Sequence, residues 1–214
     1  MEIPSAKYWE EITSKLSKLF KIFFDSEKSI IYSNIKRGKK IIDIGCGYGR
    51  TIEYSLKCNP KFILGIDHNP KVISLAKKYF KDNKKVTLKV GNSSRLPAKR
   101  NSFDYAILVG LYSNLGNKKE KTLKEIHRVL KKRGILISSA YNEDAFDERI
   151  RYYKKIKIPI KKIVGNTVYF PREIGDDVSE QFHKSDLVSQ FSKAGFRILK
   201  LRKKGVGYVG IFQK

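Results

Sequence analysis

The sequence has little cysteine, few acidic residues and no long apolar run. Its 214 residues include two cysteines and three histidines. Cys46 and Cys58 form neither a disulfide framework nor the spacing of a metal site, so we expect no metal. No apolar run approaches the roughly 18–20 residues that a membrane span requires, so we expect no membrane partner. The first residues lack the charged-then-apolar pattern of a secretion signal, which favours a cytoplasmic protein.

The shortage of acidic residues leaves a formal net charge of +25, from 46 lysines and arginines against 21 aspartates and glutamates. A basic field of this size attracts polyanions, nucleic acids among them. The alternative is a lysine-rich background like that of some thermophiles, but there glutamate rises together with lysine, and here it does not. The charge therefore leaves an RNA partner open. The length and a hydrophobic content of 41% predict a single globular domain.

One stretch, residues 40–50, organises the chain. Residues 40–44 form an apolar run interrupted by a single carboxylate, Asp43, and favour a buried strand. Three glycines follow at alternate positions: Gly45, Gly47 and Gly49. Glycine lets the backbone turn sharply and lie against a ligand. A strand, a glycine turn and a helix N-terminus together predict a site for a polar ligand at the carboxyl end of a parallel sheet.

The spacing of these glycines differs from the dinucleotide fingerprint G-x-G-x-x-G. The pattern here is G-x-G-x-G, and it resembles motif I of the class I S-adenosylmethionine-dependent methyltransferases. In that family the loop wraps the methionine part of the cofactor, which carries an amino group and no phosphate. The resemblance implies S-adenosylmethionine as the cofactor, with Asp43, Cys46 and the three glycines at its methionine end. An acidic residue before the glycines suits an ammonium group and would repel a pyrophosphate.

Further motifs follow in the order of that family. Asp67 closes a predicted strand at 62–66 and would accept hydrogen bonds from the ribose hydroxyls, with His68 beside it. The stretch 91–97 resembles the family's G-D-A-x-x-L-P segment, with Asn92 in place of the acid. The Asn92 amide oxygen would accept from the adenine amino group, and Ser93 would be its backbone neighbour. The predicted strand at 102–109 matches the family's S-F-D entry. The remaining cofactor candidates are Val109, at the end of that strand, and Tyr8, in an N-terminal aromatic segment that could close over the cofactor.

Four residues are candidates for a role in catalysis. Tyr112 and Asn114 follow the strand whose end faces the methyl group in such folds, where they would orient a substrate. Each has an ordinary alternative, because Tyr112 could pack and Asn114 could cap a turn. A base is needed only if the acceptor enters protonated, and Tyr112, Tyr141 and His183 are the candidates for that role.

The resemblance implies an α/β fold, with a seven-stranded, mostly parallel sheet, helices on both faces and a C-terminal antiparallel β-hairpin (the Rossmann-like methyltransferase fold). We divide the single domain into an N-terminal helical cover (1–38), a cofactor-binding core (39–142), a substrate-recognition insertion (143–180) and a final helix with the hairpin (181–214). Helices are predicted at 5–24 and 26–36 in the cover, and at 185–194, N-capped by Ser185, in the last part.

The insertion is where the family pattern ends. After a predicted helix at 144–155, residues 154–162 alternate lysine with isoleucine, which predicts a two-faced strand with a basic outer side and a hairpin partner at 166–170. The sequence favours an S-adenosylmethionine-dependent methyltransferase that transfers a methyl group by in-line displacement to a small molecule. An RNA methyltransferase that uses the basic insertion is the alternative. A protein methyltransferase and a non-catalytic binding module with the cofactor fold are less favoured.

Overall fold

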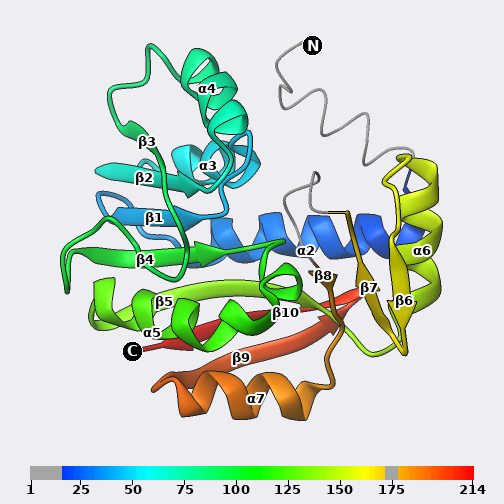
Figure 1. Cartoon of the computed structure of the whole chain (residues 1–214). Helices are drawn as coiled ribbons and strands as arrows, with labels where there is room; N and C mark the ends of the chain where they lie inside the picture. The colour runs from blue at the N-terminus through cyan, green and yellow to red at the C-terminus, as the bar shows by residue number, and fades with distance from the viewer. Residues whose placement is uncertain (1–15, 172–177) are drawn as a thin grey trace.

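A seven-stranded sheet forms the centre of the computed structural model, which describes residues 16–171 and 178–214. The strand order is β3-β2-β1-β4-β5-β10-β9, with β1 to β5 parallel and β10 antiparallel to both of its neighbours (Figure 1). This is the predicted fold, including the C-terminal hairpin. The strands are β1 (Lys40–Ile44), β2 (Phe62–Asp67), β3 (Val86–Val90), β4 (Phe103–Leu108), β5 (Leu130–Tyr141), β9 (Arg197–Lys204) and β10 (Gly207–Gln213).

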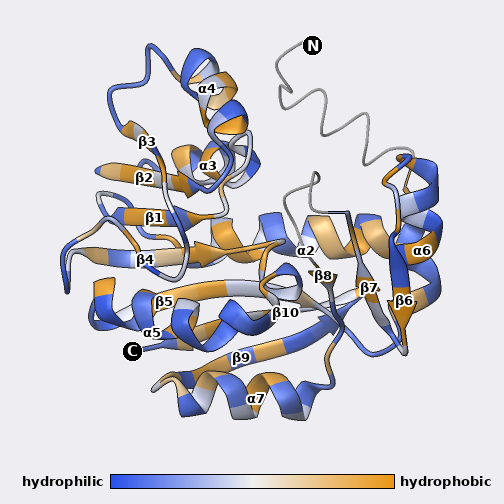
Figure 2. Ribbon diagram, in the orientation of Figure 1, coloured by the Kyte–Doolittle hydropathy of each residue, from blue (hydrophilic) through white to orange (hydrophobic). Residues whose placement is uncertain are grey.

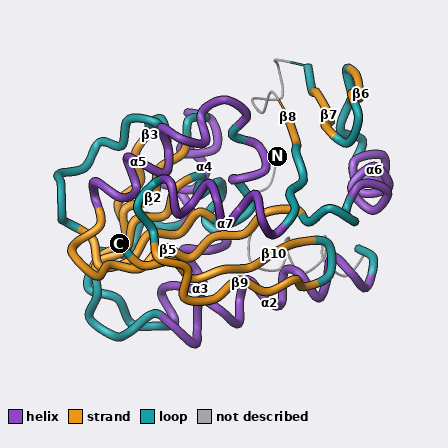
Figure 3. The backbone as a smooth tube through the Cα atoms, turned by 90° about the horizontal axis from the view of Figure 1, so that it is seen from below, coloured by secondary structure: helices purple, strands orange, loops and turns teal. Residues whose placement is uncertain are grey.

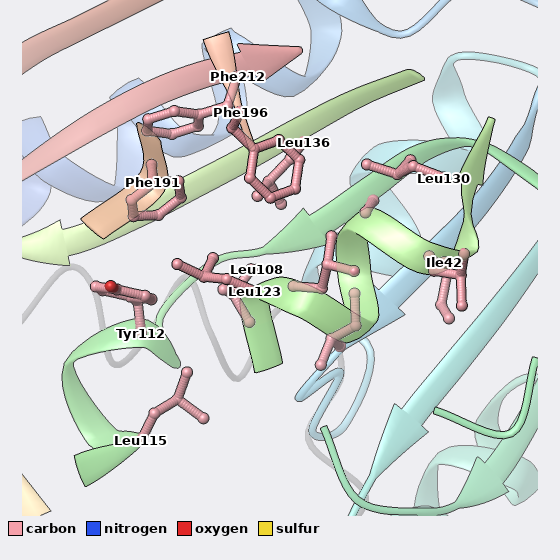
Figure 4. Close-up of a cluster of buried hydrophobic side chains, with 14 of the residues drawn as sticks. Ile42, Leu108, Tyr112, Leu115, Leu123, Leu130, Leu136, Phe191, Phe196 and Phe212 are labelled. Carbon is pink, nitrogen blue, oxygen red and sulfur yellow. The ribbon is translucent and has the colours of Figure 1, made fainter. Parts of the chain in front are cut away.

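Helices cover both faces of the sheet, and each face has its own hydrophobic cluster. Figure 3 shows two helices on one side, α2 and α3, and two on the other, α5 and α7. Figure 4 shows the cluster beneath α5 and α7, where Phe191, Phe196 and Phe212 pack together. The helices are α2 (Lys18–Asn34), α3 (Arg50–Lys57), α4 (Pro70–Tyr79), α5 (Lys119–Val129), α6 (Phe146–Lys155) and α7 (Lys184–Lys193).

Local sequence signals explain how some of these helices begin. At the start of α4, the Asn69 side chain accepts hydrogen bonds from the backbone of Lys71 and Val72, and Pro70 stands at the first helical position. The predicted cap of α7 is wrong by two residues. His183, not Ser185, is the N-cap, and its backbone N–H donates to the Asp186 carboxylate at 2.9 Å.

The N-terminal cover differs from its prediction. Instead of a break between helices at 5–24 and 26–36, one continuous helix, α2, runs from Lys18 to Asn34. Its buried stripe is Phe20, Phe23, Glu27, Ile30 and Ile31. Glu27 is charged and interrupts the apolar pattern in the sequence, so the pattern did not predict one continuous helix. Tyr8 and the first part of the predicted helix lie outside the described residues.

The insertion forms α6 and a small three-stranded sheet, β6-β7-β8. The predicted strand at 154–162 is wrong for all but its last residue. Helix α6 continues to Lys155, and the chain then turns at Lys157, whose φ is +56°. The predicted hairpin partner at 166–170 is confirmed as a strand, because β7 lies within this range and pairs antiparallel with β6. The three strands are β6 (Lys162–Val164), β7 (Thr167–Tyr169) and β8 (Val178–Ser179).

Hydrophilic residues cover the outer faces of the helices and much of the edge strand β9, while apolar residues fill the central strands (Figure 2). Lysine and arginine on an edge strand oppose pairing with another sheet. Within residues 16–171 and 178–214, every helix is too short or too polar to cross a membrane.

Candidate functional site

Two clefts lie at the carboxyl ends of the parallel strands, on the side of the sheet toward which β1, β2 and β4 point in Figure 1. The first, about 310 Å³, we call the polar cleft. The second, about 220 Å³, we call the aromatic cleft. Gly45 lines both, so the clefts meet at the glycine loop. The polar cleft is lined by Asp67, His68, Asn92, Ser93 and Asn114 among others, and the aromatic cleft by Phe23, Phe24, Tyr141, Tyr152, Cys46, Gly47, Val109 and Ser139 among others.

The three glycines of the loop have different roles, although all have positive φ. A Cβ at Gly45 would lie 2.6 Å from Leu111 Cδ2, and a Cβ at Gly49 would lie 2.2 Å from Phe80 Cε2. A Cβ at Gly47 would meet no atom within 4 Å. Gly45 and Gly49 are therefore required by packing within the protein. Gly47 leaves open space beside the backbone at the aromatic cleft, where a ligand can approach closely.

Asp67 is positioned by backbone donors at the end of β2. Its Oδ2 accepts from Gly47 N–H at 3.0 Å, and its Oδ1 accepts from Asn69 N–H at 2.9 Å. The carboxylate thus links the glycine loop to the start of α4 and still lines the polar cleft. His68 follows it with Nδ1 3.6 Å from Asp67 Oδ1 and its ring half exposed.

Asp43 lies behind the loop rather than in either cleft. Its side chain is fully buried, and the Thr51 hydroxyl donates to Asp43 Oδ2 at 2.5 Å. Burial raises the pKa of Asp43 to about 7, against the lowering effects of the Thr51 hydrogen bond and the Arg50 charge. The predicted direct contact with a ligand ammonium group does not fit this position. Asp43 reaches the aromatic cleft only through Thr51, which lines it.

Comparisons with known proteins agree with this geometry. A family model described as “Methyltransferase domain” matches residues 42–138. An uncharacterized protein of Methanocaldococcus jannaschii is 32% identical over 74% of this chain. A demethylmenaquinone methyltransferase of Staphylococcus saprophyticus is 27% identical over 79% of this chain and 75% of its own length. A crystal structure of an S-adenosylmethionine-dependent methyltransferase from Methanosarcina mazei has a TM-score of 0.67 and 26% identity, and the match covers 86% of this chain and 96% of that chain.

In its family match and in its fold, the chain is similar to the class I S-adenosylmethionine-dependent methyltransferases. It spans 62% of the M. jannaschii protein and 41% of the fungal sterol 24-C-methyltransferases to which it is also similar. S-adenosylmethionine is the cofactor of this family. The site fits it in two respects: an acidic residue ends β2 in the polar cleft, and the open space beside Gly47 leaves room for the donor next to the backbone.

The candidate adenine residues lie in the polar cleft, with one difference from the prediction. Asn92 Oδ1 already accepts from the Ser94 backbone N–H at 3.0 Å and from the Ser94 hydroxyl at 2.8 Å. These two bonds use both lone pairs of the amide oxygen. The oxygen is therefore not free to accept from an adenine amino group unless Ser94 moves. Ser93 lies alongside, with its hydroxyl 3.0 Å from Thr122 Oγ1.

Of Tyr112, Asn114 and His183, only Asn114 lines the polar or the aromatic cleft, whereas Tyr141, the other candidate base, lines the aromatic cleft. Tyr112 is fully buried between Phe182 and Phe191, and its hydroxyl donates to Gln190 Oε1 at 2.5 Å (Figure 4). Burial raises the pKa of Tyr112 above its ordinary value. The predicted substrate contact of Tyr112 is therefore wrong in this structure. His183 caps α7 and lines neither cleft, so its predicted role as a base has no geometric support.

Sequence reasoning missed a buried polar network behind the aromatic cleft. Glu27 on α2 is fully buried; it accepts from Arg50 Nη2 at 2.9 Å and from the Ser139 hydroxyl at 2.6 Å. Ser139 Oγ in turn accepts from Gly110 N–H at 3.0 Å. The network joins α2 to α3, to β5 and to the loop after β4. The available signal was Glu27 itself, an acidic residue at a position where the helical period requires an apolar one.

Proposed function

We propose that this protein transfers the methyl group of S-adenosylmethionine to a small-molecule acceptor. The observation that carries the proposal is the junction of the polar and aromatic clefts at Gly45. A donor whose adenosine lies in the polar cleft has its reactive end at that junction. An acceptor in the aromatic cleft then meets the methyl group there.

The residues at this edge of the sheet have separate tasks in the proposal. Asp67 accepts hydrogen bonds from the ribose hydroxyls. His68, Asn92 and Ser93 surround the adenine, with Asn92 reoriented from its present turn. The methionine end lies along Gly45, Cys46, Gly47 and Gly49, next to Val109, with Asp43 supporting the loop from behind through Thr51.

The reaction requires the protein to align the acceptor with the methyl group more than it requires the protein to transfer a proton. The cofactor supplies a methyl group already activated by its sulfonium. The protein's contribution is to hold the acceptor in line with that methyl group and to keep water away. Aromatic rings from α2, β5 and α6 line the aromatic cleft. These rings hold the acceptor in place and exclude water.

A small acceptor is favoured over RNA by two observations. The aromatic cleft measures about 220 Å³, which suits a compact molecule. The basic two-faced strand that was to bind RNA is absent from residues 154–161, which form the end of α6 and a turn. The demethylmenaquinone methyltransferase relative is named for a small-molecule substrate. Activity in the cytoplasm remains our expectation from the sequence.

The cofactor proposal is tested by thermal unfolding with S-adenosylhomocysteine. Ligand at about 100 times its dissociation constant adds about 2.7 kcal/mol to the free energy of unfolding. Asp67→Ala should remove most of this stabilisation, while Asp82→Ala, an exposed aspartate outside both clefts, should retain it. A wild-type melting temperature that does not respond to the ligand contradicts the proposal.

The acceptor class is tested with methyl-labelled S-adenosylmethionine and an extract of the source cells, separated into small molecules, RNA and protein. We expect the label in the small-molecule fraction. Label in RNA would indicate that the basic residues of the protein bind the substrate, and it would overturn the small-molecule proposal.

A further inference from the structure

Several aromatic side chains line the aromatic cleft. Phe23 and Phe24 come from α2, Tyr141 from the end of β5 and Tyr152 from α6. The rings of Phe23 and Tyr141 have centroids 6.1 Å apart at an interplanar angle of 38°. Ring faces arranged in this way pack best against another planar, π-bearing molecule. The cleft therefore selects for the shape of an aromatic ring.

The described lining of this cleft offers no general base, since it contains neither a carboxylate nor an imidazole. Tyr141 is the titratable group that sequence reasoning named here. Burial, together with the nearby Tyr152, Tyr153 and Glu27, raises the pKa of Tyr141 well above its ordinary value, against the effect of Arg149. Its hydroxyl thus keeps its proton. The hydroxyl also makes no hydrogen bond within the described part of the chain, so it is available to donate to a bound molecule.

A buried positive charge lies next to this tyrosine. Arg149 on α6 is fully buried, and its guanidinium carbon is 5.1 Å from the centroid of the Tyr141 ring. Its partners are neutral oxygens: Ser179 O at 2.6 Å, Ser179 Oγ at 3.1 Å, Gln181 Oε1 at 2.9 Å and Asn166 O at 3.4 Å. Its Nε has no hydrogen-bond partner, and no carboxylate pairs with it among the described residues.

This charge differs from the other arginine near the cleft. Arg50 itself lines the cleft and stacks on the ring of Phe24 at 5.0 Å, but Glu27 balances its charge, whereas Arg149 lies behind Tyr141. Arg149 has no such counter-charge among the residues that the structure describes. A buried cation without an anion is unfavourable, and a negative group bound in the aromatic cleft would reduce that cost. The unbalanced cation therefore favours an anionic ligand over a neutral one.

We propose that the methyl acceptor is a planar aromatic compound with an acidic hydroxyl group, bound between these rings and methylated as its oxyanion. The inference rests on the proposed methyltransferase function. The hydroxyl proton passes to solvent on binding. The oxyanion's electron pair then forms the O–C bond to the methyl group, the C–S bond breaks, and its electron pair stays on sulfur. Arg149 acts through Tyr141 as a positioning residue, and Tyr141 donates to the acceptor oxygen.

The test uses 4-nitrophenol, whose ionised form is yellow, with the full chain saturated by S-adenosylhomocysteine. The absorbance of the bound dye is followed against pH. We expect its midpoint about one pH unit below that of the free dye, because the positive charge behind Tyr141 favours the ionised form. Arg149→Met should abolish the shift, and Arg149→Lys should restore most of it. Arg151→Met, at an exposed arginine of the same helix, should leave it unchanged.

Stabilisation by S-adenosylhomocysteine, measured on each variant, shows that the fold and the cofactor site are intact. If Arg149→Met does not fold, Tyr141→Phe provides the second measurement, with an expected three- to tenfold weaker binding of the dye. A dye that fails to bind, or that binds with an unchanged or raised midpoint, overturns the inference while the methyltransferase proposal stands. Loss of the response to S-adenosylhomocysteine in the wild type overturns both.

Discussion

The polar cleft and the aromatic cleft share one glycine and differ in how the chain builds them. In the polar cleft, Asp67 is the last residue of β2 and Asn92 lies two residues after β3, and the carboxyl ends of these successive strands share one edge of the sheet. The aromatic cleft takes its rings from two regions that are far apart in sequence: α2, and the consecutive elements β5 and α6. Cofactor binding is therefore encoded in a fixed order along the chain, whereas acceptor binding depends on how distant helices pack.

The two clefts also differ in what lies behind them. A neutralisable carboxyl, Asp43, supports the loop between them, whereas a buried ion pair, Glu27 with Arg50, holds the helix that supplies two rings of the aromatic cleft. Three substitutions test this difference, beginning with the largest effect.

Glu27→Gln should lower the free energy of unfolding by about 4 kcal/mol, because it leaves the buried Arg50 charge without its counter-charge. Urea denaturation of the free protein measures the change. Glu120→Gln breaks the exposed pair with Lys124 on α5 and is the matched control, for which we expect no measurable change. A stability equal to that of the wild type would show that the ion pair does not hold α2 in place.

Asp43→Asn should stabilise the free protein at pH 8 by about 4 kcal/mol and have little effect near pH 4. The folded protein keeps a proton on Asp43 up to about pH 7, whereas the unfolded chain releases it at its ordinary value, 3.8. Between these values the folded state binds more protons, so the stability of the wild type falls as pH rises. The asparagine oxygen still accepts from the Thr51 hydroxyl.

Melting temperatures of both proteins across pH 4–8 provide the measurement for Asp43→Asn. The two curves should separate with increasing pH and become parallel above pH 7. A constant difference at all pH values would mean that Asp43 does not titrate in this range.

Tyr112→Phe should cost about 1 kcal/mol of stability, because it removes the hydroxyl that donates to Gln190 in the core. The rate of methyl transfer should not change. Asn114→Ala, which alters a side chain of the polar cleft, serves for comparison and should weaken the binding of S-adenosylhomocysteine. A fall in kcat for Tyr112→Phe at unchanged cofactor affinity would restore the catalytic role predicted from the sequence.

The sequence predicted the elements whose signals are local. Asp67 follows a short apolar run, and Asn69 with Pro70 marks the start of α4, so both could be located without a structure. Tyr112 was placed in the active site because a polar residue at a strand end normally faces the ligand. Its side chain instead turns to Gln190, 78 residues further along the chain. Nothing near Tyr112 in sequence signals that partner.

The insertion shows the same limit. Alternation of lysine and isoleucine fits a strand, but the chain turns at Lys157 after the end of α6. The roles of Glu27 and Arg149 depend on Ser139 and Ser179, residues 112 and 30 positions away. Hydrogen bonds between distant residues leave no periodic pattern, and for that reason the acceptor side of the site emerged only from the structure.

Because the C-terminal hairpin is synthesised last, the two clefts are completed at different times during synthesis. Gly207 on β10 pairs with Tyr141, and the turn at Gly205 lies so close to α2 that a Cβ there would stand 1.9 Å from Leu19 O. The rings of the aromatic cleft thus gain their support from a strand made after all of them. At roughly 5–20 residues per second, the ribosome finishes β10 several seconds after Tyr141. During that interval a nascent chain already carries the residues of the glycine loop and Asp67 but lacks the wall against which an acceptor is held.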